Sequence, residues 1–229
     1  KPKKKLNFFF GIIVSIVMSV SIVFLIEYFD NTIRSIEQIE RRGLSILGII
    51  PSIGMHDRKK KNKRKINLKN SNVNNLQRRL ITQEDPKSPI SEAYRSLRTN
   101  IMYSNSQNEK AQFILVSSCG PGEGKTTTIA NLAITYANLG KKTLLIDSDL
   151  RKPVIHKVFN LEKNPGFTSF LANKFELEKI TNKTEINNLD VITSGVVPPN
   201  PSELLGSANM GDFIKLVQDK YDIVLFDTP

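Results

Sequence analysis

One stretch of the chain, residues 117–127, constrains the fold more than any other because its flanks define its structural setting. It reads SSCGPGEGKTT, follows the apolar run 113–116 and precedes the helical pattern 128–133. A strand, a glycine-rich turn, Gly-Lys-Thr and a helix in this order are typical of a phosphate-binding loop. The glycines let backbone N–H groups approach a polyphosphate, and the helix presents its positive amino-terminal end to that anion. The sequence therefore predicts a nucleotide site at this loop.

Single positions of the loop carry separate expectations. Lys125 supplies a point charge for the outer phosphates, and the Thr126 hydroxyl is placed to ligate Mg²⁺. The loop departs from the general pattern at Cys119, where glycine is usual, but Gly120 and Gly122 can supply the turn. The alternative is an ordinary glycine-rich turn that happens to precede Lys-Thr. The residues expected to bind ATP are Gly120, Pro121, Gly122, Glu123, Gly124, Lys125, Thr126 and Thr127.

Two further apolar runs lead into aspartates. Residues 143–146 precede Asp147 and Asp149, and residues 223–226 precede Asp227. A lone aspartate in such a place often only caps a helix or closes a turn. In phosphoryl transfer, however, a carboxylate must orient the attacking oxygen or hold Mg²⁺. We expect Asp147 to act as base or metal ligand, Asp149 to contact metal-bound water or order its loop, and Asp227 to ligate Mg²⁺.

Strands and helices alternate from residue 111 onward. Strands are expected over 112–117, 142–147, 189–193 and 222–227, and helices over 91–103, from the loop to 139, over 167–172, 176–181 and 210–220, and in a region opening at 201–202. This alternation predicts an α/β fold, with a parallel sheet of the P-loop NTPase type and helices on both faces. Ligands bind at the carboxyl ends of such strands, where the loop and the aspartates fall.

Residues 8–26 form an apolar run near the start of the chain. They contain no charge and only three serines. Because about 20 apolar residues in a helix span the hydrocarbon core of a bilayer, residues 1–27 are expected to be a transmembrane helix with a basic flank. A signal peptide has a shorter apolar region and a small-residue cleavage site, which is absent here. A helix buried in a protein core is the other alternative.

The net charge of +11 is concentrated in two blocks. One comprises Lys1, Lys3, Lys4 and Lys5, and the other lies within residues 58–65; together they account for the whole excess. The balanced remainder weakens a nucleic-acid interpretation. Basic tracts beside an apolar segment suit anionic membrane lipids, although a solvated charge run is the alternative.

The region between the apolar run and the P-loop domain divides into two parts. Residues 28–53 are expected to hold a short amphipathic helix over 30–42 and a short strand within 47–51. Residues 54–85 are polar and basic, which predicts a flexible linker. The P-loop domain is then expected over 86–229, and a domain that uses ATP must face the cytosol. The first residue is not Met, so we expect the chain to be a fragment.

Charged residues recur at three-residue intervals in the predicted helix 91–103. Glu92, Arg95 and Arg98 therefore lie near one helical face. On an isolated helix this is an ordinary charged stripe. Beside an ATP site it can instead be a self-association surface, because arginine makes directional bidentate bonds to carboxylates.

The motifs together resemble those of the bacterial tyrosine kinases fused to polysaccharide chain-length regulators, the BY-kinases. Their phosphate loop is similar to residues 117–127, and their D-x-D-x-R motif is similar to residues 147–151. Their Asp-[ST]-Pro-Pro motif is similar to residues 227–229, where the chain ends before the last proline. Their E-x-x-R-x-x-R ring-assembly motif matches Glu92, Arg95 and Arg98, and Pro198-Pro199-Asn200-Pro201-Ser202-Glu203-Leu204-Leu205 is also similar to family members.

This resemblance implies a membrane-anchored, ATP- and Mg²⁺-dependent protein tyrosine kinase that autophosphorylates between the subunits of a ring. It implies regulation of capsular or exopolysaccharide synthesis and export at the bacterial inner membrane, with the export machinery and a phosphotyrosine phosphatase as partners. The family's acceptor is a tyrosine cluster at the carboxyl terminus. Such a cluster is absent here, since the five tyrosines are scattered: Tyr28, Tyr94, Tyr103, Tyr136 and Tyr221.

Two other classes of protein fit the same motifs. A membrane-tethered partitioning-type ATPase of this fold would hydrolyse ATP without forming phosphotyrosine. A non-catalytic chain-length scaffold would bind nucleotide without turnover. A tyrosine-rich tail beyond residue 229 would favour the kinase over both.

Overall fold

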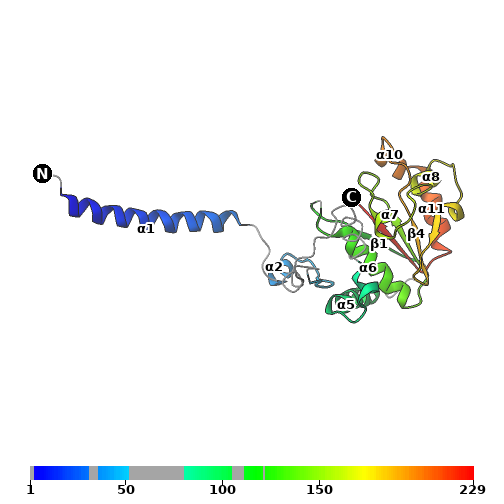
Figure 1. The fold of residues 1–229 in the computed structure, drawn as a ribbon, viewed down its shortest axis with the longest axis horizontal. Coiled ribbons are helices and arrows are strands. Elements are labelled where there is room, and N and C mark those ends of the chain that lie inside the picture. The colour runs from blue at the N-terminus through cyan, green and yellow to red at the C-terminus, as the bar shows by residue number, and fades with distance from the viewer. Residues whose placement is uncertain (1–2, 31–35, 52–79, 105–110, 121) are drawn as a thin grey trace, which may run out of the picture. The chain divides into compact units, whose positions relative to one another are not determined.

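A computed structural model describes residues 3–30, 36–51, 80–104, 111–120 and 122–229. It divides into two compact units, Lys1–Ile46 and Leu47–Pro229, which are described separately (Figure 1).

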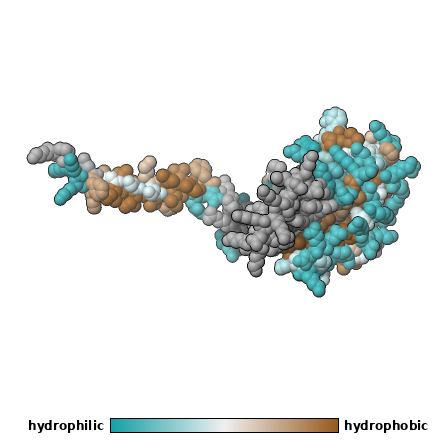
Figure 2. Space-filling model, in the orientation of Figure 1, coloured by the Kyte–Doolittle hydropathy of each residue, from teal (hydrophilic) through white to brown (hydrophobic). Residues whose placement is uncertain are grey.

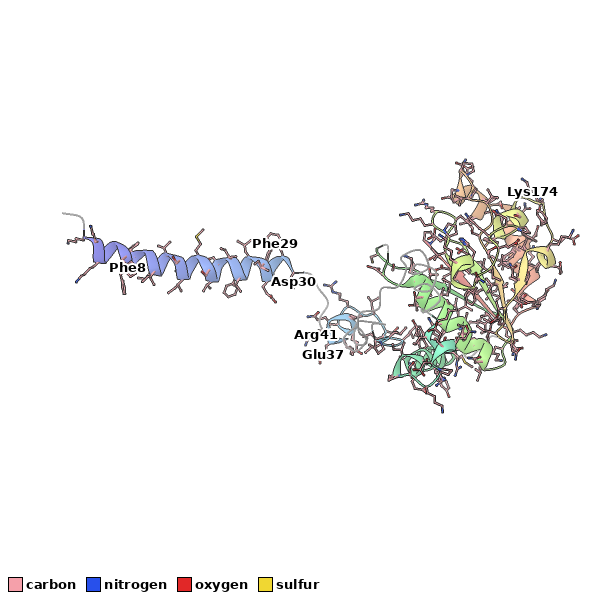
Figure 3. The ribbon with its side chains drawn as sticks, viewed as in Figure 1. Phe8, Phe29, Asp30, Glu37, Arg41 and Lys174 are labelled. Carbon is pink, nitrogen blue, oxygen red and sulfur yellow. The ribbon has the colours of Figure 1, made fainter. Side chains whose placement is uncertain are left out.

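The first unit is dominated by helix α1, Lys4–Phe29. Its stretch Phe8–Phe29 has a mean hydropathy of 2.8 and none of it is buried, and among the described residues it is the one helix long and apolar enough to cross a membrane. Figure 2 shows the apolar surface along it, and Figure 3 labels both ends of the stretch. Its serine hydroxyls bond within the helix, as when Ser15 Oγ donates to the Gly11 carbonyl at 2.8 Å. The helix thus satisfies its own polar groups, as a lipid environment requires.

The segment after α1 contains helix α2, Ile36–Glu40. It lies inside the predicted helix 30–42, of which residues 31–35 are outside the described part. Gly43 follows with a φ of +76°, a left-handed conformation that favours glycine and ends the helix.

The second unit is built on a five-stranded sheet in the order β1-β5-β2-β4-β3. The strands are β1 Gln112–Val116, β2 Thr143–Asp147, β3 Thr181–Lys183, β4 Leu189–Ile192 and β5 Ile223–Asp227. The first four in this order are parallel, but β3 pairs antiparallel with β4. The four predicted strands are the parallel ones, and the antiparallel edge strand β3 was not predicted. The tight connection from β3 to β4 leaves no room for the crossover that a parallel pair needs.

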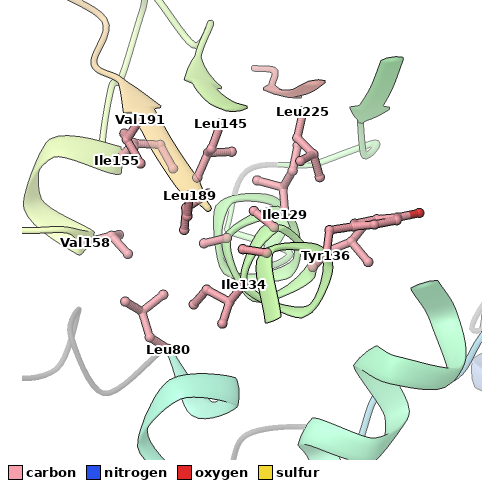
Figure 4. Packing of buried hydrophobic residues seen from close by; sticks show 14 of the residues in the cluster. Leu80, Ile129, Ile134, Tyr136, Leu145, Ile155, Val158, Leu189, Val191 and Leu225 are labelled. Atoms are coloured by element: carbon pink, nitrogen blue, oxygen red, sulfur yellow. The ribbon is translucent and has the colours of Figure 1, made fainter. Parts of the chain in front are cut away.

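Helices cover both faces of this sheet, as predicted. One face packs against α6, Lys125–Asn138, and α7, Ile155–Val158, where Leu145 and Leu225 of the strands meet Ile129 of α6 (Figure 4). The opposite face packs against α8 Phe167–Leu171, α9 Leu177–Ile180 and α11 Ala208–Gln218. Alternate strand residues enter the two clusters, so each central strand is buried on both sides. Helix α10, Pro201–Leu205, begins at the predicted Pro201.

Two more helices lie against α6. They are α4, Ile81–Glu84, and α5, Pro89–Ser104, and Figure 1 labels α5 beside α6. The prediction of a linker over 54–85 was wrong for its last six residues, because Leu80 and Thr82 are buried. Thr82 donates to Asn131 Oδ1 of α6 from both its backbone N (3.0 Å) and its hydroxyl (2.8 Å). Residues 52–79 of that predicted linker lie outside the described part.

Residues 47–51 were predicted to form a short strand, and the structure shows none there. The Leu47 carbonyl accepts a hydrogen bond of 2.7 Å from the Asn100 side chain. A Cβ on Gly48 would lie 3.3 Å from Leu97. The segment is therefore held by side chains of α5 rather than by a neighbouring strand.

Candidate nucleotide-binding site

The predicted phosphate-binding loop joins β1 to α6. Strand β1 ends at Val116 and α6 begins at Lys125. Gly122 and Gly124 have φ values of +80° and +97°, which side chains rarely tolerate, so glycine is required at both positions. Pro121 lies outside the described residues. The loop thus lies between a strand and a helix, the setting expected of a phosphate-binding loop.

The Lys125 side chain turns back over the loop. Its ammonium group lies 3.0 Å from Ser118 Oγ and 3.4 Å from the Gly120 carbonyl. The Ser118 hydroxyl and the Gly120 backbone also stabilise the Glu123 carboxylate and lower its pKa. Sequence reasoning missed Ser118 as a member of this arrangement, although it belongs to the loop motif. The charge of Lys125 is therefore held over the loop by polar neighbours.

Thr126, in the first turn of α6, faces Asp227 at the end of β5. Its hydroxyl donates to Asp227 Oδ2 at 2.7 Å. Asp227 is paired in register with Asp147 of β2, so the ends of adjacent strands bring the two aspartates together. The loop, Thr126 and both carboxylates thus meet at the carboxyl edge of the sheet, where ligands bind in folds of this kind.

Asp147 and Asp227 are buried, with 0% and 1% of their surface exposed. Asp147 Oδ2 accepts hydrogen bonds from the backbone N–H groups of Val154 (3.2 Å) and Ile155 (3.1 Å). In each carboxylate the Oδ1 atom is buried without a hydrogen-bond partner. A buried polar atom of this kind is costly and uncommon, which points to a further ligand.

The two carboxylates hold protons more tightly than ordinary aspartates. Burial raises the pKa of Asp147 to about 7, and the neighbouring charge of Asp227 adds to this increase. Burial also raises the pKa of Asp227 to about 6, although the hydrogen bond from Thr126 opposes the increase. A divalent cation would remove the repulsion and favour the charged forms.

These residues fit Mg²⁺. Magnesium prefers oxygen ligands, keeps several waters, and is usually bound by one or two carboxylates together with substrate phosphates. The two unpartnered Oδ1 atoms and the Thr126 hydroxyl supply such oxygens. No group of three or more histidine, cysteine or acidic side chains suited to a metal occurs in the described parts of the chain. The site is therefore suited to a metal that arrives with its nucleotide.

The remaining predicted residues of this region have mainly structural contacts. Asp149 Oδ1 accepts bonds from the backbone N–H groups of Arg151 (3.0 Å) and Lys152 (2.9 Å), and so orders the loop after β2. The Thr127 carbonyl accepts a bond of 2.8 Å from the Asn131 side chain. Because Asn131 also receives Thr82, it links α4 to the first turn of α6. Sequence reasoning missed Asn131, which resembles any polar helix residue.

Sequence reasoning also missed Ser148. Its hydroxyl donates to the Asp227 carbonyl at 2.6 Å and ties the loop after β2 to the end of β5.

The three charged residues of α5 separate into two settings. Glu92 and Arg95 form an exposed ion pair of 2.9 Å. Arg98 instead turns toward α6 and donates to the Thr135 carbonyl at 2.6 Å. Arg95 also donates to the Pro86 carbonyl at 2.6 Å, so both arginines bond within the domain. Glu92 and Arg95 nevertheless keep 63% and 41% of their side-chain surface exposed.

Comparisons with known proteins agree with this geometry. An AAA domain family matches residues 111–229. The tyrosine-protein kinase YwqD of Bacillus subtilis (strain 168) is 45% identical over 162 residues, which cover 71% of this chain and 68% of that protein. The chain belongs to the bacterial tyrosine kinase family. The tyrosine-protein kinase etk of Escherichia coli (strain K12) is 33% identical over 231 residues, covering 100% of this chain and 32% of that protein.

Solved structures of this family share the fold. The kinase domain of Escherichia coli tyrosine kinase ETK superposes with a TM-score of 0.72 at 30% identity, covering 86% of this chain and 74% of that one. The chimerical protein CapA2B2 gives a TM-score of 0.70 at 40% identity, covering 85% and 75% of the two chains. The predicted bacterial tyrosine kinase family and its P-loop fold are therefore confirmed.

Proposed function

We propose that this chain binds Mg·ATP at the carboxyl edge of its sheet and transfers the γ-phosphate to tyrosine hydroxyl groups. The observation that carries the proposal is the pair of buried carboxylates, Asp147 and Asp227, each with an unpartnered oxygen beside the phosphate-binding loop. Membership of a family whose relatives are named tyrosine-protein kinases supports the choice of acceptor.

Each residue of the site has a role in this proposal. Backbone N–H groups of the loop and Lys125 hold the phosphates, and Thr126 and Asp227 hold Mg²⁺, which neutralises charge on the phosphates when bound. Asp147 accepts the proton of the attacking hydroxyl. A bound divalent cation favours the charged form of this carboxylate, which is the form that can accept a proton. Asp149 keeps the loop after β2 in place.

The proposal extends to the setting of the enzyme. Helix α1 anchors the chain in the bacterial inner membrane, and the P-loop domain lies in the cytoplasm. The basic blocks face anionic lipids. Glu92 and Arg95, helped by Arg98, mediate self-association into a ring. The enzyme regulates synthesis and export of capsular or exopolysaccharide together with the export machinery, and a phosphotyrosine phosphatase reverses its action.

The experiment that tests the proposal replaces Lys125 by methionine in the full chain, solubilised in detergent and incubated with Mg·ATP. We expect phosphorylation of a poly(Glu,Tyr) copolymer in the wild type and its loss in Lys125→Met. Lys141→Met is the matched control, because Lys141 is an exposed lysine beyond the other end of α6. ATP hydrolysis without phosphotyrosine would indicate a partitioning-type ATPase instead, and full transfer by Lys125→Met would refute the assignment.

A further inference from the structure

The five tyrosines of the chain all lie in described residues and differ sharply in exposure. Tyr94 and Tyr136 are 1% and 0% exposed. Tyr221 is partly buried, and its hydroxyl donates to Asp190 at 2.8 Å. Tyr28 and Tyr103 are 83% and 78% exposed. A phosphoryl acceptor must enter the active site of an enzyme, so the three tyrosines that are buried or engaged in hydrogen bonds are poor acceptors.

The two exposed tyrosines occupy different units. Tyr28 lies at the end of the apolar helix α1. Tyr103 lies in the last turn of α5 in the P-loop unit. Carbonyl groups in the last turn of a helix lack partners within the helix, so this turn unwinds at less cost than the helix interior. Tyr103 is therefore the exposed phenol of the P-loop unit in a segment that can extend into an active site.

We propose that Tyr103 is a phosphoryl acceptor of this kinase, and that a second copy of the chain phosphorylates it. The proposal rests on the proposed function. In the transfer, the phenolic oxygen of Tyr103 forms a bond to the γ-phosphorus, and the bond between that phosphorus and the β,γ-bridging oxygen breaks. The phenolic proton passes to a carboxylate, Asp147 of the donor copy, and ADP leaves with the bonding electrons.

The course of α5 along α6 carries Tyr103 away from the phosphate-binding loop of its own copy. Burial raises the pKa of Tyr94, and the side chain of Thr128 partly opposes this, so Tyr94 lies near the first turn of α6, beside the phosphate-binding loop. Arg98 reaches Thr135, further along α6, so the two helices run in the same direction. Tyr103 follows Tyr94 by nine positions in α5, a rise of about 14 Å away from the loop. In-line transfer requires contact between the hydroxyl and the phosphorus. This direction of α5 therefore favours transfer from a second copy, and the mixing experiment below tests it.

The same helix offers a route for a second copy to approach. Glu92 and Arg95 are exposed on α5, with 63% and 41% of their side chains accessible, and are the proposed self-association surface. A copy that contacts this helix is brought near its other end as well. Transfer between copies then benefits from a high local concentration of the acceptor.

The first test maps phosphotyrosine by mass spectrometry in the full chain, solubilised in detergent with Mg·ATP. We expect phosphate on Tyr103 in the wild type. The variant Tyr103→Phe should lose the phosphate that maps to α5, as Lys125→Met does, while it phosphorylates poly(Glu,Tyr) copolymer like the wild type. Tyr28→Phe is the matched control and should retain phosphate on Tyr103. Phosphate on other tyrosines of the wild type with none on Tyr103 would overturn the proposal.

The second test separates donor from acceptor. Tyr103→Phe supplies the active kinase, and Lys125→Met supplies an inactive chain that retains Tyr103. We expect phosphate on Tyr103 of the Lys125→Met chain only when both are mixed. Transfer to the copolymer without phosphate on Tyr103 would refute Tyr103 as the acceptor but would still support the proposed kinase function. If neither the copolymer nor Tyr103 is phosphorylated, both the proposed kinase function and the proposed acceptor site are refuted.

Discussion

Aspartates are buried at both the amino and the carboxyl edge of the parallel strands, but their carboxylates differ in hydrogen bonding. At the amino edge, Asp190 is 7% exposed, and its Oδ2 atom accepts bonds from Lys183 (2.7 Å) and Tyr221 (2.8 Å). At the carboxyl edge, Asp147 and Asp227 are buried more deeply, and each leaves one oxygen without a partner. The buried carboxylate at the amino edge is paired, whereas the two at the carboxyl edge are incompletely paired. This difference indicates that the carboxyl edge binds a ligand.

Replacing Asp227 by asparagine should produce the largest effect on activity. The change removes a proposed Mg²⁺ ligand and should lower the rate of phosphoryl transfer by about 10²- to 10³-fold, as when one preorganised electrostatic group is removed. The variant should not be less stable than the wild type, because it loses a buried charge. Kinase assays with thermal unfolding check both parts. A large loss of stability with little loss of activity would contradict the claim that the carboxyl edge serves ligand binding rather than stability.

The free energy of unfolding should depend on pH because Asp147 titrates differently in the folded and unfolded protein. The carboxyl has an ordinary pKa of 3.8 when the chain is unfolded and about 7 when it is folded. Between these values the folded protein holds a proton that the unfolded chain has lost. The resulting stabilisation is complete below about pH 4, is lost as the pH rises to about 7, and amounts to a few kcal/mol at most.

Urea unfolding of the metal-free protein at a series of pH values measures this slope. Asp147→Asn should lose the larger part of it, and Asp227 accounts for part of the remainder. A stability that rises from pH 4 to pH 7 by the same amount in both proteins would contradict the raised pKa.

Replacing Asp190 by asparagine should lower stability and leave activity unchanged, the reverse of what we expect for Asp227→Asn. The change weakens charge-assisted hydrogen bonds from Lys183 and Tyr221 and should lower the free energy of unfolding by about 1–3 kcal/mol. Phosphoryl transfer should be unchanged at a temperature where the variant remains folded. Loss of activity in the fully folded variant would show that the amino edge also serves the reaction.

Lys183→Met should have the smallest effect. The lysine side chain is 83% exposed, so its ion pair with Asp190 should contribute less than about 1 kcal/mol. Tyr221 still donates to the carboxylate in this variant. Unfolding curves measure the difference, and a cost equal to that of Asp190→Asn would show that the lysine, rather than the tyrosine, stabilises this edge.

Much of the fold could be predicted because its strands are apolar and its turns contain glycine. The parallel strands before Asp147 and Asp227 are fully buried, and such strands appear in sequence as continuous apolar runs. Strand β3, with the sequence TNK, lies at an edge and carries no such pattern. Helix α4 has four residues and is held by tertiary contacts of Leu80 and Thr82, which local sequence does not reveal.

The candidate site could be predicted in its members but not in its geometry. The motifs identify Lys125, Asp147 and Asp227, because each follows a recognisable strand. That Asp147 and Asp227 lie on adjacent strands depends on the order of the sheet, in which β5 lies between β1 and β2. The unpartnered oxygens also follow from packing. Asn131 and Ser148 act through long-range contacts and have no motif of their own.

A crystal structure with Mg²⁺ and a non-hydrolysable ATP analogue tests the central claim most directly. We expect the phosphates to contact the backbone of residues 120–127 and Lys125, and Mg²⁺ to lie beside Thr126 and Asp227, with Asp147 close to the γ-phosphate. Nucleotide bound elsewhere, or Mg²⁺ remote from both aspartates, would contradict it.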